Sequence, residues 1–371
     1  MRNLILCLFI IMLVLSCTEE TTEPDFILPE AIAPSLGDGS EGDPYQISSL
    51  ENLYWLSQNP DAWDKYYLQT SDIDAYETRE WICGGFKPIG YSFQNFTGYY
   101  DGDNHVIDGV FIERSQHDIT GVFGFINDAE IRNLGITNAE VRGRDNVGGL
   151  AAINNSSTIH NCYFSGEVYG NSKIGGLVGT NEYATISNSY SIGTVYGDGE
   201  IVGGLAGYNR HYFARIINSF SKASVRGSDK VGGFVGANIS TMILPASIEN
   251  SYSRGEVIRI SGSNGNNIGS FAGQSVNGII KNCYVTGSVT YQNVENPTDK
   301  GFIGYISDSE CKNNFFDSEA SAQICGIGAE AKTTAEMQIE STFIDAGWDF
   351  DEIWTIDGVI NDGYPYLLWE R

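Results

Sequence analysis

The sequence predicts an all-β fold, a right-handed parallel β-helix of about seven coils with small capping helices at both ends. Two repeated phrases carry this prediction. A glycine phrase occurs four times, as "VGGLAAIN" (147–154), "IGGLVGTN" (174–181), "VGGLAGYN" (202–209) and "VGGFVGAN" (231–238). An asparagine phrase such as "TISNSYSIGTV" follows each copy, and its asparagine recurs at intervals of 27 to 32 residues. Units this short cannot enclose a core alone, so we expect them to stack as coils.

Each unit contains short alternating runs broken by Gly, Asn and Ser, which is typical of strands and turns. The recurring asparagines are Asn133, Asn161, Asn188, Asn218, Asn250, Asn282 and Asn313. An isoleucine stands two residues before the asparagine in six of the seven units, and a Tyr or Phe stands two residues after it in six. Period-2 spacing predicts that the isoleucine and the aromatic residue share the inward face of the coil.

The asparagine column has two interpretations. Stacked amides at a β-helix corner bond one another and the backbone, which predicts a structural ladder. A row of amides could instead line a sugar-binding face. The aromatic column is likewise either a core stack, which we favour, or a platform for carbohydrate.

The glycine phrase followed by "NSYS.G.V" resembles the GLUG repeat. The flanks "GDPYQISSLENLYWL" (42–56) and "WDFDEIWTIDGVINDGYPYLLW" (348–369) are similar to segments that often accompany it. The resemblance covers about residues 37–371. It implies a β-helix similar to those of bacterial surface proteins, of adhesins and of the non-catalytic part of some IgA-cleaving metallopeptidases.

The first sixteen residues are interpreted as a lipoprotein signal peptide. Arg2 precedes the apolar run "LILCLFIIMLVLS", which is short for a membrane span. The sequence "VLSC" at 14–17 resembles a bacterial lipobox, so Cys17 is the expected lipidation site. An ordinary signal peptide and a single anchor helix are the alternatives. The acidic residues after Cys17 resemble a surface-export signal, and a plain solvated linker has the same composition.

We therefore divide the chain into five segments. Residues 1–16 are the signal peptide, 17–36 a flexible tether, 37–118 an N-terminal capping module, 119–316 the repeats and 317–371 a C-terminal capping module. Two patterns predict capping helices: "SSLE" at 48–51 and "TTAE" at 333–336 each resemble a capping box.

The formal net charge of −26 excludes nucleic acid as a partner, because phosphates would be repelled. Residues 147–294 are nearly neutral, with nine Lys and Arg against seven Asp and Glu, so the acidity lies in the flanks. Acidic flanks favour solubility and could also hold Ca²⁺.

No motif for catalysis is found in the sequence. It has no HExxH, GxSxG, P-loop or CxxC pattern. No repeat column places two carboxylates and a base on adjacent coils, as a glycoside hydrolase or a polysaccharide lyase would require. The run "DGDNHVID" (101–108) is a partial match to a calcium loop through Asp101, Asp103 and Asn104, and a tight Asp-Gly turn is the alternative. No cofactor is expected, and the cysteines of the repeats are expected to be buried free thiols.

We expect a non-enzymatic lipoprotein that is anchored by its lipid to the bacterial outer membrane, at the cell surface. Its β-helix would present a rigid adhesion surface or bind an extracellular glycan, a host protein or a matrix protein. A polysaccharide lyase or glycoside hydrolase, and a structural spacer without a ligand, are the alternatives.

Overall fold

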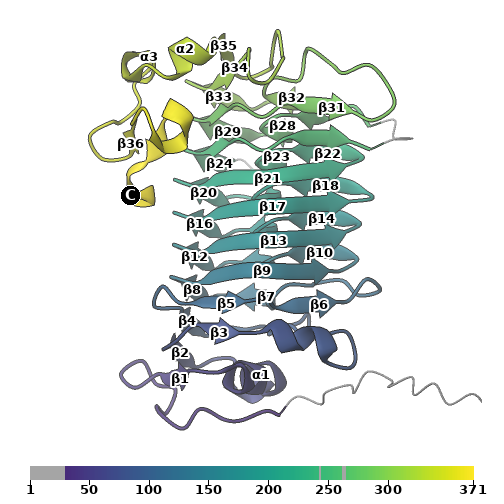
Figure 1. Ribbon diagram of the computed structural model, residues 1–371, viewed down its shortest axis with the longest axis vertical. Helices are drawn as coiled ribbons and strands as arrows, with labels where there is room; N and C mark the ends of the chain where they lie inside the picture. Colours follow the sequence, from purple (N-terminus) through teal and green to yellow (C-terminus); the bar gives the residue numbers. More distant parts are fainter. Residues whose placement is uncertain (1–29, 242–243, 261–264) are drawn as a thin grey trace, which may run out of the picture.

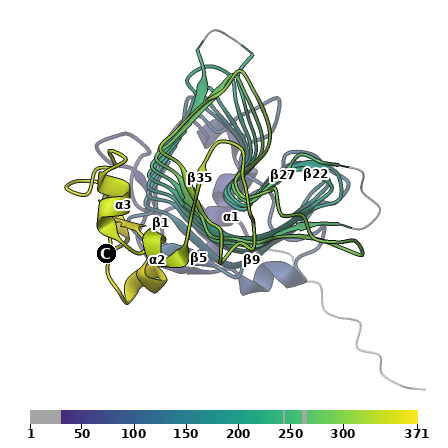
Figure 2. The ribbon, with the colours of Figure 1, turned by 90° about the horizontal axis from the view of Figure 1, so that it is seen from above.

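The computed structural model describes residues 30–241, 244–260 and 265–371, which form a parallel β-helix. Figure 1 shows the coils stacked along one axis, and in Figure 2, seen down that axis, successive coils superimpose. Every pairing between the strands of the coils is parallel, while β36–β37 is antiparallel. The predicted fold class is confirmed.

Four parallel sheets run along the solenoid, and each is named by its number of strands. The ten-stranded sheet contains β1 (Tyr45–Ile47), β2 (Tyr66–Gln69), β4 (Tyr99–Asp101), β8 (Glu130–Arg132), β12 (Thr158–His160), β16 (Thr185–Ser187), β20 (Arg215–Ile217), β24 (Ala246–Glu249), β29 (Gly278–Lys281) and β33 (Glu310–Lys312). The seven-stranded sheet contains β7 (Phe123–Asn127), β11 (Ala151–Asn155), β15 (Val178–Glu182), β19 (Ala206–Arg210), β23 (Val235–Ile239), β28 (Ala272–Val276) and β32 (Ile303–Ser307).

The other two sheets complete each coil. The five-stranded sheet contains β10 (Asp145–Gly148), β14 (Ser172–Gly175), β18 (Glu200–Gly203), β22 (Asp229–Gly232) and β27 (Ile268–Gly269). The thirteen-stranded sheet contains β3 (Ile73–Asp74), β5 (Val106–Asp108), β6 (Phe111–Glu113), β9 (Gly135–Arg142), β13 (Tyr163–Gly170), β17 (Tyr190–Gly197), β21 (Phe220–Gly227), β25 (Tyr252–Ser253), β26 (Val257–Arg259), β30 (Tyr284–Val285), β31 (Val289–Tyr291), β34 (Phe315–Asp317) and β35 (Glu330–Lys332).

A coil in the middle of the stack visits four sheets in turn, as β10, β11, β12 and β13 do. The glycine phrase is therefore split between two strands. The first glycine of the phrase ends a strand of the five-stranded sheet, and the rest enters the seven-stranded sheet. A Cβ at Gly175 would lie 2.0 Å from the carbonyl oxygen of Val178 and 2.6 Å from the nitrogen of Gly207 in the next coil. The glycine is required because backbones of adjacent coils approach closely there.

Stacking begins earlier in the chain than the repeats do. Strands β1, β2 and β4, from the segment interpreted as the N-terminal capping module, pair in register below β8 in the ten-stranded sheet. Helix α1 (Leu50–Gln58), followed by η1 (Pro60–Ala62), lies at this end of the stack (Figure 1). Its N-cap is Ser49, whose hydroxyl accepts a bond from the nitrogen of Asn52.

The interior of the solenoid is filled by stacked aliphatic columns. The isoleucines two residues before each asparagine are fully buried: Ile131, Ile159, Ile186, Ile216, Ile248 and Ile280. The large residue of the glycine phrase is buried too, and Phe234, Phe271 and Phe302 stack with ring centroids 4.7 to 4.9 Å apart. Cys162 and Cys283 are buried free thiols in this core, and burial raises the pKa of Cys162 to about 12.

The prediction that the aromatic column shares the inward face with the isoleucines is wrong. The asparagine between them has a positive φ, 47° at Asn188, so the chain turns a corner there and the period-2 alternation is interrupted. The residue after the asparagine points inward and the aromatic residue points outward. The rings stack along the outside of the thirteen-stranded sheet, as Tyr163–Tyr190 do at 4.8 Å and an interplanar angle of 1°.

The C-terminal segment covers much of this outer aromatic column. It comprises α2 (Thr334–Met337), α3 (Glu340–Ile344), η3 (Ile360–Gly363), η4 (Leu368–Glu370) and the hairpin of β36 (Trp354–Thr355) with β37 (Tyr366–Leu367). This C-terminal cap lies against the side of the solenoid rather than over its end (Figures 1 and 2). Helix α2 begins with the predicted capping box of Thr333 and Glu336. Together the cap and Phe220, Tyr252, Tyr284 and Phe315 form a second hydrophobic core.

Candidate functional site

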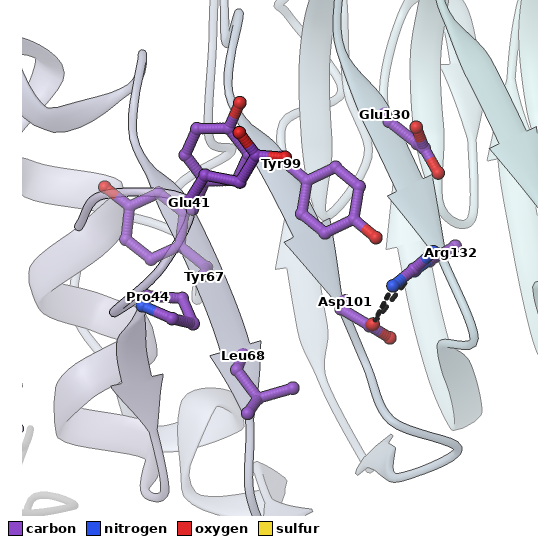
Figure 3. Close-up of a pocket in the computed structure, with 9 residues that line it drawn as sticks. Glu41, Pro44, Tyr67, Leu68, Tyr99, Asp101, Glu130 and Arg132 are labelled. Carbon is purple, nitrogen blue, oxygen red and sulfur yellow. Dashed lines mark hydrogen bonds and ion pairs between the residues drawn. The ribbon is translucent and has the colours of Figure 1, made fainter. Parts of the chain in front are cut away.

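An open hollow of about 570 Å³ lies on the outer face of the ten-stranded sheet, near its N-terminal end (Figure 3). The loop that carries Glu41 and Pro44 forms one wall, and β2, β4 and β8 form the floor. Tyr67 and Tyr100 point into the core and are fully buried. Because side chains alternate along a strand, their neighbours Tyr66, Leu68, Tyr99 and Asp101 face outward into the hollow.

Two tyrosines form the aromatic part of this site. Tyr66 and Tyr99 are register partners in β2 and β4, and their ring centroids lie 5.5 Å apart with the rings tilted by 34°. Both side chains are half-buried and present a hydroxyl as well as an apolar ring. The guanidinium of Arg132 lies over the Tyr99 ring at 4.9 Å. Such a cation–π contact is attractive and favours this arrangement of the two side chains.

Asp101 is held as a carboxylate. Its Oδ2 lies 2.8 Å from Arg132 (Figure 3). Its Oδ1 accepts bonds from the Asn133 amide and from the backbone nitrogen of Asp103. Burial raises the pKa of Asp101, but these hydrogen bonds and the Arg132 charge outweigh it, so the pKa lies below its ordinary value. A general acid for glycoside hydrolysis needs a raised pKa, the opposite direction.

A second hollow, of about 390 Å³, continues from the first along the solenoid and shares Tyr66, Tyr99 and Glu130 with it. It extends across the corner between the seven-stranded and ten-stranded sheets, where it is lined by the polar residues Asp128, Ser156 and Thr158. The charged residues around the two hollows are predominantly acidic: Glu41, Asp64, Asp101, Asp128 and Glu130 against Arg132.

The calcium candidate residues form a tight turn. Asp103 and Asn104 both have positive φ, 47° and 65°, and Asp103 donates its backbone nitrogen to Asp101 at 3.0 Å. The oxygens of Asp101 are engaged by N–H donors, and an arginine lies beside them. This environment fits the Asp-Gly turn interpretation better than a cation site. Within the described ranges, no group of three or more His, Cys, Asp or Glu residues is arranged to hold a metal ion.

The seven predicted ladder asparagines lie in one file at an outer corner, half-buried, each with a φ between 47° and 55°. Side-chain bonds join Asn161 to Asn133 at 2.8 Å, Asn282 to Asn250 at 3.1 Å and Asn313 to Asn282 at 3.3 Å. Their common property is thus the left-handed backbone of a corner, which Asn tolerates better than most residues.

A buried asparagine ladder that we did not predict lies inside the solenoid. The last residue of each glycine phrase, at Asn154, Asn181, Asn209 and Asn238, is fully buried. Each amide nitrogen donates to the next amide oxygen, at 2.7, 2.8 and 2.8 Å along the file. The signal was present in the sequence as the final letter of all four phrases.

Cys17 and the apolar run before it lie outside the described residues, so the lipid anchor remains a prediction. In the part of the chain that the structure describes, none of the helices has the length and apolar character needed to span a membrane.

Comparison with known proteins agrees with this architecture. The model of the GLUG motif matches residues 143–169, 170–196 and 264–290. Halomucin of Haloquadratum walsbyi is 38% identical over 128 residues, and a Gly-rich membrane protein of Evansella cellulosilytica, so named provisionally, is 33% identical over 125 residues. Each match covers 33% of this chain, but only 1% and 14% of the two relatives.

A crystal structure from Bacteroides ovatus, of a protein provisionally named an immunoglobulin A1 protease, has the same fold. It superimposes with a TM-score of 0.59 and covers 90% of this chain and 95% of that one. The sequences are 19% identical, so the likeness concerns the fold alone.

Proposed function

We propose that this GLUG-repeat β-helix is a lipid-anchored cell-surface protein that binds an uncharged glycan, without cleaving it, in the hollow around Tyr66 and Tyr99. The single observation that carries the proposal is this tyrosine pair, which faces outward on adjacent coils among fixed polar groups. The names of the two curated relatives, a mucin-like name and a membrane protein, support a surface location.

The chemistry of the hollow suits a sugar. A phenol ring offers an apolar surface to the C–H groups of a sugar ring, and its hydroxyl can bond to sugar hydroxyls. Carboxylates such as Glu41 and Glu130 accept hydrogen bonds from hydroxyls, and Arg132 donates them. An open hollow on a rigid sheet also leaves room for a polymer to pass through rather than end there.

The excess of carboxylates around the hollows selects against acidic glycans. A uronic-acid or sulfated polymer would bring like charges close to Glu41, Asp64, Asp128 and Glu130. A neutral glycan meets no such repulsion, so it is the favoured class of ligand.

A glycan array tests the proposal directly. The wild-type protein should bind neutral glycans, and the double variant Tyr66→Ala/Tyr99→Ala should lose at least tenfold in affinity, equivalent to about 1.4 kcal/mol. The matched control is Tyr169→Ala/Tyr196→Ala, a tyrosine pair on adjacent coils of the thirteen-stranded sheet, 6.2 Å apart. Unchanged binding by the Tyr66/Tyr99 variant, or binding of acidic glycans alone, would contradict the proposal.

A hydrolase or lyase is the competing function, because Asp101, Glu130 and Arg132 bring two carboxylates and a base to adjacent strands. The lowered pKa of Asp101 and its ion pair with Arg132 favour a binding role. Incubation of the bound glycan with the protein should release no shorter product. Product release that is abolished by Glu130→Gln would establish the enzyme instead.

A further inference from the structure

A second aromatic cluster stands on the same corner of the solenoid as the hollows. The first residue after each strand of the seven-stranded sheet turns this corner with a positive φ of 48° to 71° in six coils. Four of these residues are small and polar, as this backbone conformation favours: Asp128, Ser156, Asn277 and Asp308. The other two are Tyr183 and His211. Neither the turn nor the core requires an aromatic ring at these two positions.

Two further aromatic residues are inserted directly after His211. Tyr212 and Phe213 stand between His211 and the buried Ala214, whereas Ala184 follows Tyr183 directly in the coil below. Phe213 has a φ of 63°, unfavourable for a bulky side chain, and remains 59% exposed. Burial therefore does not explain the insertion, and an exposed ring on a strained backbone indicates a functional role.

The four rings form one compact group. Tyr183 and His211 stack at 4.6 Å with an interplanar angle of 8°. Tyr212 meets Tyr183 edge to face at 4.9 Å and meets Phe213 edge to face at 5.2 Å. His211 is also held by Glu182, at 3.2 Å from its Nε2. The cluster is thus preorganised rather than a set of independent loop side chains.

The register of the sheets places this cluster in line with the hollows. Asp128, Ser156, Tyr183 and His211 follow the register partners Asn127, Asn155, Glu182 and Arg210. Asp128 and Ser156 line the second hollow, and Tyr183 and His211 continue the same file. On the ten-stranded sheet, four register steps lead from Tyr99 through Glu130, Thr158 and Thr185 to Arg215. At about 4.8 Å per step, the coil that carries His211, Tyr212 and Phe213 is about 19 Å from Tyr99 along the axis.

We propose that this corner is one extended binding line for a linear, uncharged glycan, with Tyr66 and Tyr99 at one end and the Tyr183–Phe213 cluster at the other. This inference rests on the proposed function and adds the length and direction of the ligand. The residues between the two ends, Asp128, Glu130, Ser156, Thr158 and Thr185, offer hydroxyl and carboxylate groups to sugar hydroxyls. A protein partner fits this surface less well, because the stretch between the two ends is polar and hollowed, whereas the core of a protein–protein interface is apolar.

Affinity as a function of ligand length tests the inference. Wild-type protein should bind a long oligosaccharide, such as an octasaccharide, at least about tenfold more tightly than the trisaccharide of the same neutral sugar, because only the longer ligand reaches both ends. The variant Tyr212→Ser/Phe213→Ser should keep the trisaccharide affinity and lose the gain with length. Its thermal stability should stay close to that of wild type, because the replaced rings lie in an inserted loop outside the core and Phe213 is 59% exposed.

The outcomes separate the two proposals. Binding of the trisaccharide at Tyr66 and Tyr99 without any gain for the longer ligand would overturn the extended line and leave the proposed function intact. A gain that survives in Tyr212→Ser/Phe213→Ser would also overturn it, as would a protein ligand that needs Tyr212 and Phe213 while no glycan does. Absence of binding to any glycan would overturn both proposals.

Discussion

Asparagine serves two different purposes in this chain, and the two are distinguished by burial and backbone. Asn181 is fully buried, and its side-chain amide accepts a hydrogen bond from Asn154 and donates one to Asn209. Its role is therefore to link neighbouring coils through these hydrogen bonds. Asn188 is half-buried with a φ of 47°. Its role is to adopt the left-handed backbone conformation that the corner requires. Both columns are visible in the sequence, but the sequence does not show which of them is buried, because burial depends on which residues turn the chain.

Paired substitutions separate these two purposes. Asn181→Ala should lower the free energy of unfolding by about 1–3 kcal/mol, because its ladder neighbours lose their partner in the interior. Asn188→Gly should leave stability nearly unchanged, because glycine adopts the corner conformation readily. Thermal and denaturant melts measure both variants. The assignments would be contradicted if Asn181→Ala left the free energy of unfolding unchanged. They would also be contradicted if Asn188→Gly lowered it as much as Asn181→Ala does.

The isoleucine column was predicted from spacing alone. Ile186 is fully buried and stacks between the register partners Ile159 and Ile216. Ile186→Ala should cost about 2–5 kcal/mol, because a cavity remains in a core that cannot collapse between fixed strands. A melt indistinguishable from that of wild type would contradict the packing described above.

At the scale of elements, the aromatic column and the C-terminal cap depend on each other. The cap is held by Tyr284, whose hydroxyl donates to the carbonyl of Pro365, by the ion pair of Arg254 with Asp362 and by Trp369, which donates to the carbonyl of Asn218. The period-2 spacing predicted these rings inside the solenoid. That spacing takes no account of the asparagine before each ring, whose left-handed backbone turns the chain. Once the corner is recognised, an outward column of six aromatic residues requires a cover, and the tryptophan-rich C-terminal segment is that cover.

Glu370 makes the docking of the cap dependent on pH. Burial raises its pKa above the ordinary value of 4.5, outweighing the hydrogen bonds from Leu367 and Tyr252 and the charge of Lys222. The docked state therefore binds this proton more tightly than the open state, and docking weakens as the pH rises from 4.5 through the raised pKa. Tryptophan fluorescence or limited proteolysis of the cap should show this loss in wild type. Glu370→Gln should remove it, and an identical pH profile in the two proteins would contradict the assignment.

In the molecule as a whole, the β-helix could be predicted from the sequence and the candidate binding site could not. The β-helix followed from the repeats, because each unit contributes one coil and equivalent residues stack. The site did not, because Tyr66 and Tyr99 lie in segments without the repeat, and their pairing depends on a register that only the fold shows. The inserted Tyr212 and Phe213 interrupt the repeat length, which is the sequence signal that could have marked this corner.

Lipidation of Cys17, which remains a prediction, would place the solenoid at a surface. Cys17→Ser should abolish lipid labelling and either release the protein or leave its signal uncleaved, since the lipidated cysteine would be missing. Replacement of Glu19 and Glu20 by Ala should leave lipidation intact and reduce cleavage by external protease, if the acidic pair directs export. Intact, unlipidated protein in the cytoplasm would contradict the surface location.

The most direct test of glycan binding in the hollow is a crystal structure of the protein with the neutral oligosaccharide that binds most tightly. We expect sugar rings against Tyr66 and Tyr99, with sugar hydroxyls bonded to the carboxylates and to Arg132 of the hollow. Sugar bound at another surface, or an empty hollow at ligand concentrations that saturate binding in solution, would contradict it.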